Sequence, residues 1–330
     1  MKRIELQAYG VPEDVARCVE APDAGPPQND QVVFDVIAFP INPADLSFCR
    51  GAYRLKPPLP ATPGAECVGR VTAVGRDVRY VAVGDLVINL ERENWAQQRC
   101  VRAESVIRIP PELNPRQAAM LRINPPTALL LLEDIVTLSP GDWVIQNAAN
   151  SAVGRLLIGF ARSRGLRTVN VVRRDDVIGE LGVLGADAVV RDGDGLAERV
   201  AQATGGARIR LGIDAVSGAA TARLAACLID EGTVCNYGSM SGEPPLMPTA
   251  DVVYRGVSLA GFMLGRHLAR RPIAEVRALY ERLAAQMLAG QWQAPVADVY
   301  PIESIRDALV HAQTAGKHGK VLVAPNGPLH

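Results

Sequence analysis

The chain has 330 residues, 48% of them hydrophobic, which is enough for two domains with packed cores. Its formal net charge is zero, so there is no electrostatic reason to expect binding to nucleic acid or to an anionic membrane. Because no apolar run approaches the roughly 20 residues of a membrane span, and the first ten residues lack the apolar core of a signal peptide, we expect a soluble, cytoplasmic protein.

The first ~115 residues are rich in valine, glycine and proline and contain short β-type runs at 31–41, 66–75 and 84–90. The pattern predicts strands that turn at Gly75 and Gly84, and therefore a small, mainly β barrel. Helical spacing then begins and runs across 114–137.

From residue 142 onward, strand-like and helix-like segments alternate as far as Ser239. Such alternation with apolar strands predicts a doubly wound parallel sheet covered by helices. A helix is expected over 275–292, and the last turn, helix and strand are expected to return to the first domain. The predicted fold is therefore α/β, with a β domain at 1–117 that resumes at 266–330 and a parallel-sheet domain at 118–265.

The segment Trp143–Arg155, WVIQNAANSAVGR, reads as a buried strand, a tight turn and the start of a helix near Val153. The orphan N–H groups of a helix N-terminus bind a pyrophosphate well, and small residues let the backbone approach it. Asn150 is a candidate cap, and Gly154 permits close packing. The alternative is an ordinary structural turn of small residues.

Arg173, Arg174 and Asp175 follow the next predicted strand. An acidic residue at this position accepts hydrogen bonds from a ribose 2′-hydroxyl, whereas arginine suits a 2′-phosphate. The two arginines favour NADPH over NADH. The alternative is a solvated surface charge run.

The layout of the whole chain resembles the medium-chain dehydrogenase/reductase superfamily, with a GroES-like β domain and an inserted Rossmann domain. Zinc-dependent members carry Gly-His-Glu and a cysteine ligand; here the matching positions are Gly64-Ala65-Glu66 and Asn42. The six cysteines are scattered without a C-x-x-C pair, and no histidine lies near a candidate ligand cluster. The resemblance is thus to the zinc-free branch, and no metal is expected.

Within that branch, several segments are similar to the mitochondrial-type 2-enoyl thioester reductases: 42–66, 123–132, 146–155, 165–173, YGSM at 237–240 and GFML at 261–264. The resemblance implies hydride addition to the β-carbon and proton addition to the α-carbon of an enoyl thioester, with Tyr53 as the catalytic hydrogen-bond donor or acid. It places Asn42 and Trp95 at the substrate pocket. Where the family has Gly-Thr-Trp, this chain has Glu93-Asn94-Trp95.

The resemblance also assigns residues to NADPH. The expected cofactor-binding residues are Asn124, Asn150, Ser151, Ala152, Val153, Arg173, Arg174, Asp175, Tyr237, Gly238, Ser239, Met240, Phe262, Met263, Leu264 and Lys320. Ala152 replaces a family glycine, and Met263 replaces a tryptophan.

Two other functions stay open from the sequence. A quinone or alkenal reductase of the same branch shares the fold and the hydride chemistry, and a nucleotide-binding relative without turnover fits the substitutions at Ala152 and Met263. The acyl carrier is either coenzyme A or acyl carrier protein. Arg266, Arg270 and Arg271 are expected to form a solvated helix face, and contact with a phosphopantetheine or nucleotide phosphate is the alternative. A homodimer joined through the edges of the Rossmann sheets is expected from the family.

Overall fold

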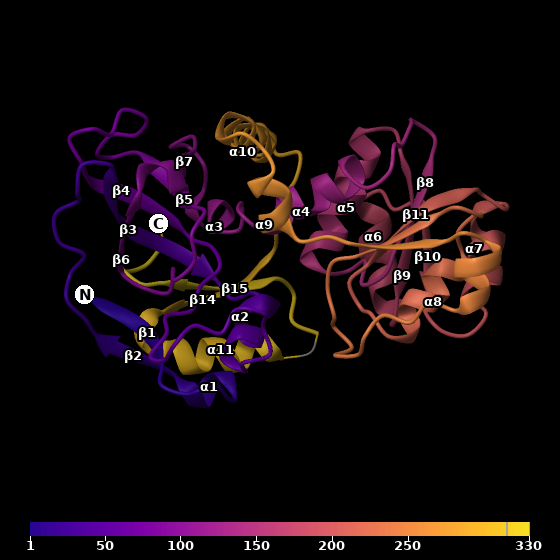
Figure 1. The fold of residues 1–330 in the computed structure, drawn as a ribbon, viewed down its shortest axis with the longest axis horizontal. Helices are drawn as coiled ribbons and strands as arrows, with labels where there is room; N and C mark the ends of the chain where they lie inside the picture. Colours follow the sequence, from indigo (N-terminus) through magenta and orange to yellow (C-terminus); the bar gives the residue numbers. More distant parts are fainter. Residues whose placement is uncertain (315, 330) are drawn as a thin grey trace. The chain divides into compact units, whose positions relative to one another are not determined.

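The computed structural model describes residues 1–314 and 316–329, and the chain divides into two compact units (Figure 1). Unit 1 contains Met1–Ile123 and Pro272–His330, and unit 2 contains Asn124–Arg271. The chain therefore crosses between units a few residues later, at both points, than the expected boundaries at 117 and 265.

Side-chain contacts explain both shifts. At the first crossing, Met120 packs in a core cluster with Ala294 and Leu322, and the Gln117 amide exchanges two 2.9 Å hydrogen bonds with the backbone of Ala294. At the second crossing, Arg271 donates two hydrogen bonds, of 2.7 and 2.8 Å, to the Asp134 carboxylate of unit 2.

Unit 1 is the β-rich unit, and its long strand β3 lies at its centre. β3 pairs antiparallel with β4, β6 and β15, in a sheet of order β14-β15-β3-β4-β5-β7 with β6 off this path. The strands are β1 (Lys2–Leu6), β2 (Ala16–Glu20), β3 (Gln31–Pro40), β4 (Val68–Val74), β5 (Leu86–Asn89), β6 (Gln98–Arg102), β7 (Val106–Arg108), β14 (Val296–Pro301) and β15 (Lys320–Ala324). The helices are α1 (Pro12–Val15), α2 (Pro43–Cys49), α3 (Pro115–Ala118), α10 (Ile273–Leu288) and α11 (Ile305–Gln313).

The turn at Gly75 forms as the sequence predicts, but residues 76–85 contain no strand. A Cβ at Gly75 would lie 1.9 Å from the Gln28 carbonyl oxygen, so only glycine fits there. The apolar character of the segment comes from single side chains, such as Val81, that enter the core beneath an irregular backbone.

Unit 2 is a six-stranded parallel sheet of order β10-β9-β8-β11-β12-β13, which confirms the predicted doubly wound fold class. Its strands are β8 (Trp143–Gln146), β9 (Arg167–Val172), β10 (Ala188–Arg191), β11 (Ile209–Asp214), β12 (Thr233–Asn236) and β13 (Ser258–Gly261). Its helices are α4 (Asn124–Glu133), α5 (Ala152–Ser163), α6 (Ile178–Val183), α7 (Leu196–Thr204), α8 (Ala219–Ala226) and α9 (Leu264–Ala269). α7 packs against β10 and α8, and α8 packs against β11 and β12; Figure 1 shows α7 and α8 beside each other. α5 packs against β9 and α4.

The predicted helical stretch over 114–137 is wrong in its continuity: it forms α3 and α4, separated by a turn at 119–123. Pro125 and Pro126 explain the break, because proline is accepted in the first turn of a helix and cannot continue one that is already formed. α4 is buried along nearly its whole length. Across 1–314 and 316–329, no helix combines the length and the apolar character that crossing a membrane would require.

Candidate active site

The turn after β8 is a cradle of small residues at the N-terminus of α5. Ala148 has a φ of +47°, Ala149 is fully buried, and α5 begins at Ala152. The Ser151 hydroxyl caps the helix by accepting a 3.1 Å hydrogen bond from the Gly154 N–H. Asn150, the predicted cap, is one residue too early for that role, and its side chain is exposed.

The first turn of helix α5 can lie close to the Ala148 and Ala149 carbonyl groups only because residue 154 is glycine. A Cβ there would lie 2.5 Å from the Ala149 carbonyl oxygen and 2.8 Å from that of Ala148, which forbids any larger residue. The first N–H groups of α5, at Ala152 and Val153, have no intrahelical partner, as in any helix. The cradle therefore suits a phosphate group.

The end of β9 carries the predicted 2′-phosphate residues. The Arg174 guanidinium lies 3.3 Å from Asp176, and the Asp175 carboxylate lies 3.3 Å from Arg191, which ends the neighbouring strand β10. Arg173 is exposed and has no partner among the residues that the structure describes. The charge of Asp175 is thus balanced within the protein, and Arg173 is available to an anion.

The segment Tyr237–Met240 follows β12, at the same edge of the sheet as the cradle. Burial raises the pKa of the Tyr237 phenol and the Ser151 side chain opposes that rise, so the two side chains influence each other across the segment and the turn. The backbone of Gly238 approaches the Ala215 carbonyl so closely that a Cβ would lie 2.8 Å from it. Ser239 and Met240 are exposed.

The remaining predicted cofactor residues of unit 2 lie at the ends of α4 and β13. Asn124 begins α4 and is 6% exposed, and its side-chain N–H₂ has no hydrogen-bond partner among the described residues. A buried amide of this kind needs an acceptor, which a ligand oxygen would supply. Phe262 stacks on His267 with ring centroids 4.3 Å apart, and Met263 and Leu264 follow it at the start of α9.

In unit 1, Asn42 bridges two buried charges. Its side-chain N–H₂ donates a 2.8 Å hydrogen bond to Glu66, and its carbonyl oxygen accepts one from the Lys320 ammonium. The other Glu66 oxygen accepts a 2.9 Å hydrogen bond from the Ile123 N–H. The structure therefore gives Lys320 and Asn42 hydrogen-bond partners within unit 1, and their expected contacts with the cofactor and the substrate stay predictions.

Burial dominates the protonation of this cluster. It raises the pKa of Glu66 to about 7, against the opposing effects of the Asn42 hydrogen bond and the Lys320 and Arg122 charges. It also raises the pKa of Asp45 and lowers that of the Lys320 ammonium. Each shift favours the neutral form of a buried group.

Tyr53 lies just beyond α2, in a turn where its N–H donates a 3.1 Å hydrogen bond to the Ser47 carbonyl. Its ring is half-buried, and the Arg92 guanidinium lies 5.0 Å from the ring centroid. Arg92 is held in turn 3.6 Å from the buried Asp45 carboxylate. The Tyr53 hydroxyl has no hydrogen-bond partner in residues 1–314 and 316–329, so it is free to donate to a ligand.

Trp95 does not line a pocket. Its side chain has no exposed surface and stacks on Phe39 with ring centroids 5.7 Å apart, inside the core of unit 1. The predicted pocket role is replaced by core packing. The residue before Asn94, Glu93, adopts a φ of +68° where the family has glycine.

A catalytic zinc does not fit these residues. Zinc needs three protein ligands, but Ala65 offers none and the Asn42 oxygen is already bonded to an ammonium. Among the described residues, no group of three or more histidine, cysteine, aspartate or glutamate side chains is placed to hold a metal.

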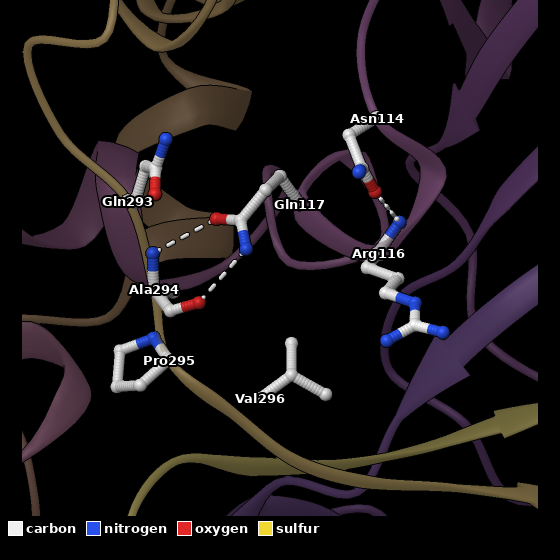
Figure 2. A pocket seen from close by; sticks show the side chains of 7 residues that line it. All are labelled: Asn114, Arg116, Gln117, Gln293, Ala294, Pro295 and Val296. Atoms are coloured by element: carbon white, nitrogen blue, oxygen red, sulfur yellow. Dashed lines mark hydrogen bonds between the residues drawn. The ribbon is translucent and has the colours of Figure 1, made fainter.

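A surface pocket of about 390 Å³ lies elsewhere in unit 1 (Figure 2). Gln117 and Ala294, joined by their paired hydrogen bonds, form one side of it, and Arg116 and the α3 N-cap residue Asn114 form the other (Figure 2). None of its lining residues belongs to the predicted site.

The main functional candidates that the sequence did not reveal are Asp214, Asn147 and Asn236. They lie at the carboxyl ends of β11, β8 and β12, and they form one hydrogen-bonded group beside the cradle. The available signal was an acidic residue ending an otherwise apolar strand, since ligands bind at the carboxyl ends of parallel strands.

Comparison with known proteins places both units in described families. The Alcohol dehydrogenase GroES-like domain family matches residues 28–110, and the Zinc-binding dehydrogenase family matches residues 152–285. The chain is 36% identical over 298 residues to the mitochondrial enoyl-(acyl-carrier-protein) reductase of Caenorhabditis elegans, a match that covers 88% of this chain and 85% of that protein.

Two solved structures have the same fold. A Bacillus thuringiensis protein assigned as an NADPH:quinone reductase matches with a TM-score of 0.92 and 28% identity, and the match covers 98% of each chain. A mutant form of the enoyl thioester reductase of Candida tropicalis matches with a TM-score of 0.84 and 23% identity, over 98% of this chain and 99% of that one.

Proposed function

Because the chain belongs to the zinc-free branch of the medium-chain dehydrogenase/reductase superfamily, we propose that it reduces the C2=C3 double bond of 2-enoyl thioesters with NADPH. The relative at 36% identity carries this activity in its name, and its match extends through both units. The observation that supports the proposal is the unpartnered hydroxyl of Tyr53, the residue to which the resemblance assigns the catalytic role.

NADPH fits the residues of unit 2. The cradle of Ala148–Val153 is built of small side chains at the start of a twelve-residue helix, which suits a pyrophosphate. Arg173 supplies an unpaired guanidinium for the 2′-phosphate, and the nearby acidic charges are matched by other arginines. Asn124 offers a buried donor without a partner.

The reaction needs a donor for the thioester oxygen and a proton for the α-carbon. When bound, NADPH supplies the hydride for the β-carbon. The Tyr53 hydroxyl donates a hydrogen bond where negative charge develops on the oxygen, or it delivers the proton. Arg92, beside the Tyr53 ring, adds a positive charge that favours an electron-rich enolate nearby. No step requires a metal.

One specific observation favours a second candidate function, quinone reduction. The Bacillus thuringiensis structure has the higher TM-score of the two solved relatives described above, and its assignment is NADPH:quinone reductase. Both reactions share the cofactor and the hydride step, so the fold does not separate them.

The deciding experiment is a turnover assay with purified protein and NADPH. Crotonyl-CoA, a quinone and an alkenal are offered in turn, and loss of NADPH absorbance is followed. Turnover with crotonyl-CoA that exceeds turnover with the others supports the proposal. Turnover with the quinone alone assigns the second candidate, and NADPH binding without turnover on any acceptor indicates a non-catalytic relative.

We also propose a homodimer formed through strand β13, which is an edge of the unit 2 sheet. Leu259 on this strand is 42% exposed, and the preceding segment exposes Val252, Val253 and Tyr254. An apolar, unpaired edge is a template for pairing with another chain. A cytoplasmic location stays a prediction, since the Caenorhabditis elegans relative is named as mitochondrial.

A further inference from the structure

Asp214 is a fully buried carboxylate that ends strand β11. One of its oxygens accepts hydrogen bonds from the Asn147 side chain at 2.6 Å and from the N–H groups of Val216 and Ser217 at 2.9 and 3.0 Å. Its other oxygen accepts from the Thr221 hydroxyl at 2.6 Å and from the Asn236 side chain at 3.0 Å. Five donors therefore converge on one buried anion.

These bonds keep the carboxylate ionised. Burial opposes the charge, but the hydrogen bonds from Thr221, Asn147, Ser217 and Asn236 outweigh it and hold the pKa of Asp214 below its ordinary value. A carboxylate is suited to this position because it is acceptor-only, whereas an amide of the same shape would turn one oxygen into a donor facing other donors.

Two of the five donors, Asn147 and Asn236, directly precede the two segments assigned to the cofactor. Asn147 directly precedes the cradle, and its side-chain oxygen also accepts a 2.7 Å hydrogen bond from the Ala215 N–H. Asn236 directly precedes Tyr237, and its side chain also bonds the Gly238 carbonyl at 2.9 Å. Asp214 thus ties the starts of both segments to a single point.

We infer that Asp214 is a positioning residue that fixes the cradle and the 237–240 segment relative to each other, so that both engage one dinucleotide. The inference rests on the proposed binding of NADPH. It assigns no contact between Asp214 and the ligand, because the carboxylate is fully buried and all its donors are protein groups. Loss of the Asp214 charge should loosen the connection between the two segments. It should therefore weaken the binding only of ligands that contact both segments.

The test compares NADPH with adenosine 2′-monophosphate, a fragment that spans neither segment and depends on the end of β9. In Asp214→Asn we expect the NADPH Kd to rise about tenfold or more, since hydrogen bonds to a charged group are lost. The Kd for the fragment should stay at its wild-type value. NADPH binding is followed by its fluorescence, and fragment binding by ligand-observed NMR, well below the melting temperature of each variant.

Two control variants separate positioning from simple destabilisation. Asn170→Ala removes another buried hydrogen-bonding side chain of the same sheet, bonded to Gln146 and Thr168, and should lower Tm without changing the NADPH Kd. Thr221→Val removes one hydrogen-bond donor to Asp214. Because Thr221 lies on helix α8, outside both segments, this variant should also lower Tm without changing the NADPH Kd. If Asp214→Asn does not fold, Asn236→Ala removes one of the hydrogen bonds to Asp214, that from the Asn236 side chain, and it should still raise the NADPH Kd.

The outcomes are distinguishable. An unchanged NADPH Kd in Asp214→Asn, or in Asn236→Ala where the first variant does not fold, overturns the inference while the proposed function stands. The inference is also overturned if Asp214→Asn weakens the binding of NADPH and of the fragment equally. It is likewise overturned if Asn170→Ala raises the NADPH Kd as much as Asp214→Asn does, because either result indicates a general structural effect. A wild-type protein that does not bind NADPH refutes the proposed function, and the inference with it.

Discussion

Replacing Glu66 by glutamine removes a buried carboxyl whose pKa lies near neutral pH. This carboxyl accepts hydrogen bonds from the Asn42 amide and the Ile123 N–H, and the charges of Lys320, Arg122 and Asp45 also act on it. Burial outweighs the favourable contacts and raises the Glu66 pKa from 4.5 to about 7. Glutamine has nearly the same shape and does not titrate, so the variant isolates the contribution of the proton.

The sign and size of the effect follow from this shift. The pKa of Glu66 is higher in the folded than in the unfolded chain, so its contribution to stability is complete below about pH 4.5 and is lost as the pH rises through about 7. A shift of this size corresponds to about 3 kcal/mol of unfolding free energy across the whole window. The lowered pKa of Lys320 contributes with the opposite sign and the raised pKa of Asp45 with the same sign, but both groups are present in the wild type and in Glu66→Gln, so the difference between the two proteins isolates Glu66.

The assay is urea unfolding of the wild type and Glu66→Gln at several pH values, followed by a signal that reports unit 1. The wild type should lose about 2 kcal/mol relative to the variant between about pH 5.5 and pH 8. Glu112→Gln makes the same chemical change on an exposed residue and should follow the wild-type curve. Parallel pH curves for the wild type and Glu66→Gln would refute the reasoning, because they would mean that the carboxyl titrates alike in both states.

Four further variants test the site and the assembly. Tyr53→Phe should lower kcat for crotonyl-CoA by about 10²-fold or more with the NADPH Kd unchanged, and a full rate removes Tyr53 from its role. Ala152→Gly should tighten NADPH binding in a fluorescence titration by removing a methyl group beside the pyrophosphate; an unchanged Kd contradicts the placement of the turn. Arg173→Ala should raise the NADPH Kd about tenfold while that for NADH is unchanged, and Arg174→Ala should do less because Arg174 already pairs with Asp176. Leu259→Arg on β13 should convert a dimer to monomers in light scattering, and a dimer that persists locates the interface elsewhere.

The sheet of unit 2 was predictable because strand and helix periods are local. Each apolar run from β8 to β12 has a turn signal at its end, and the parallel order follows from the helices between them. The break between α3 and α4 was not predicted, because the apolar residues across 114–137 keep a helical spacing. Pro125 and Pro126 did mark the start of a second helix, since proline is favoured in the first turn. The local spacing of apolar residues therefore predicts the strands and helices, and proline indicates where a helix begins.

The polar contacts of the site were harder to predict from the sequence, because they depend on which strand ends become neighbours in the folded sheets. Asp214 and Asn147 are far apart in the chain, and they meet only because β11 pairs with β8. Lys320 is separated from Asn42 by most of the sequence, and the return of β15 beside β3 brings them together. The resemblance gave Lys320 a role at the cofactor, and no pattern in the sequence indicated the ammonium–amide contact.

The buried charges of unit 1 connect the place of the absent metal to the proposed catalytic residue. The Asn42 amide bridges Lys320 and Glu66 because it carries a donor and an acceptor on one side chain. Asp45 accepts hydrogen bonds from the N–H groups of Asn42 and Ala65, and so fixes the start of the helix that leads to Tyr53. The second oxygen of Glu66 holds the N–H of Ile123, the last residue before the chain enters unit 2. The same cluster therefore anchors the segment that carries Tyr53 and the point from which the cofactor-binding unit departs, a role for which hydrogen-bonded charges suffice without a metal ion.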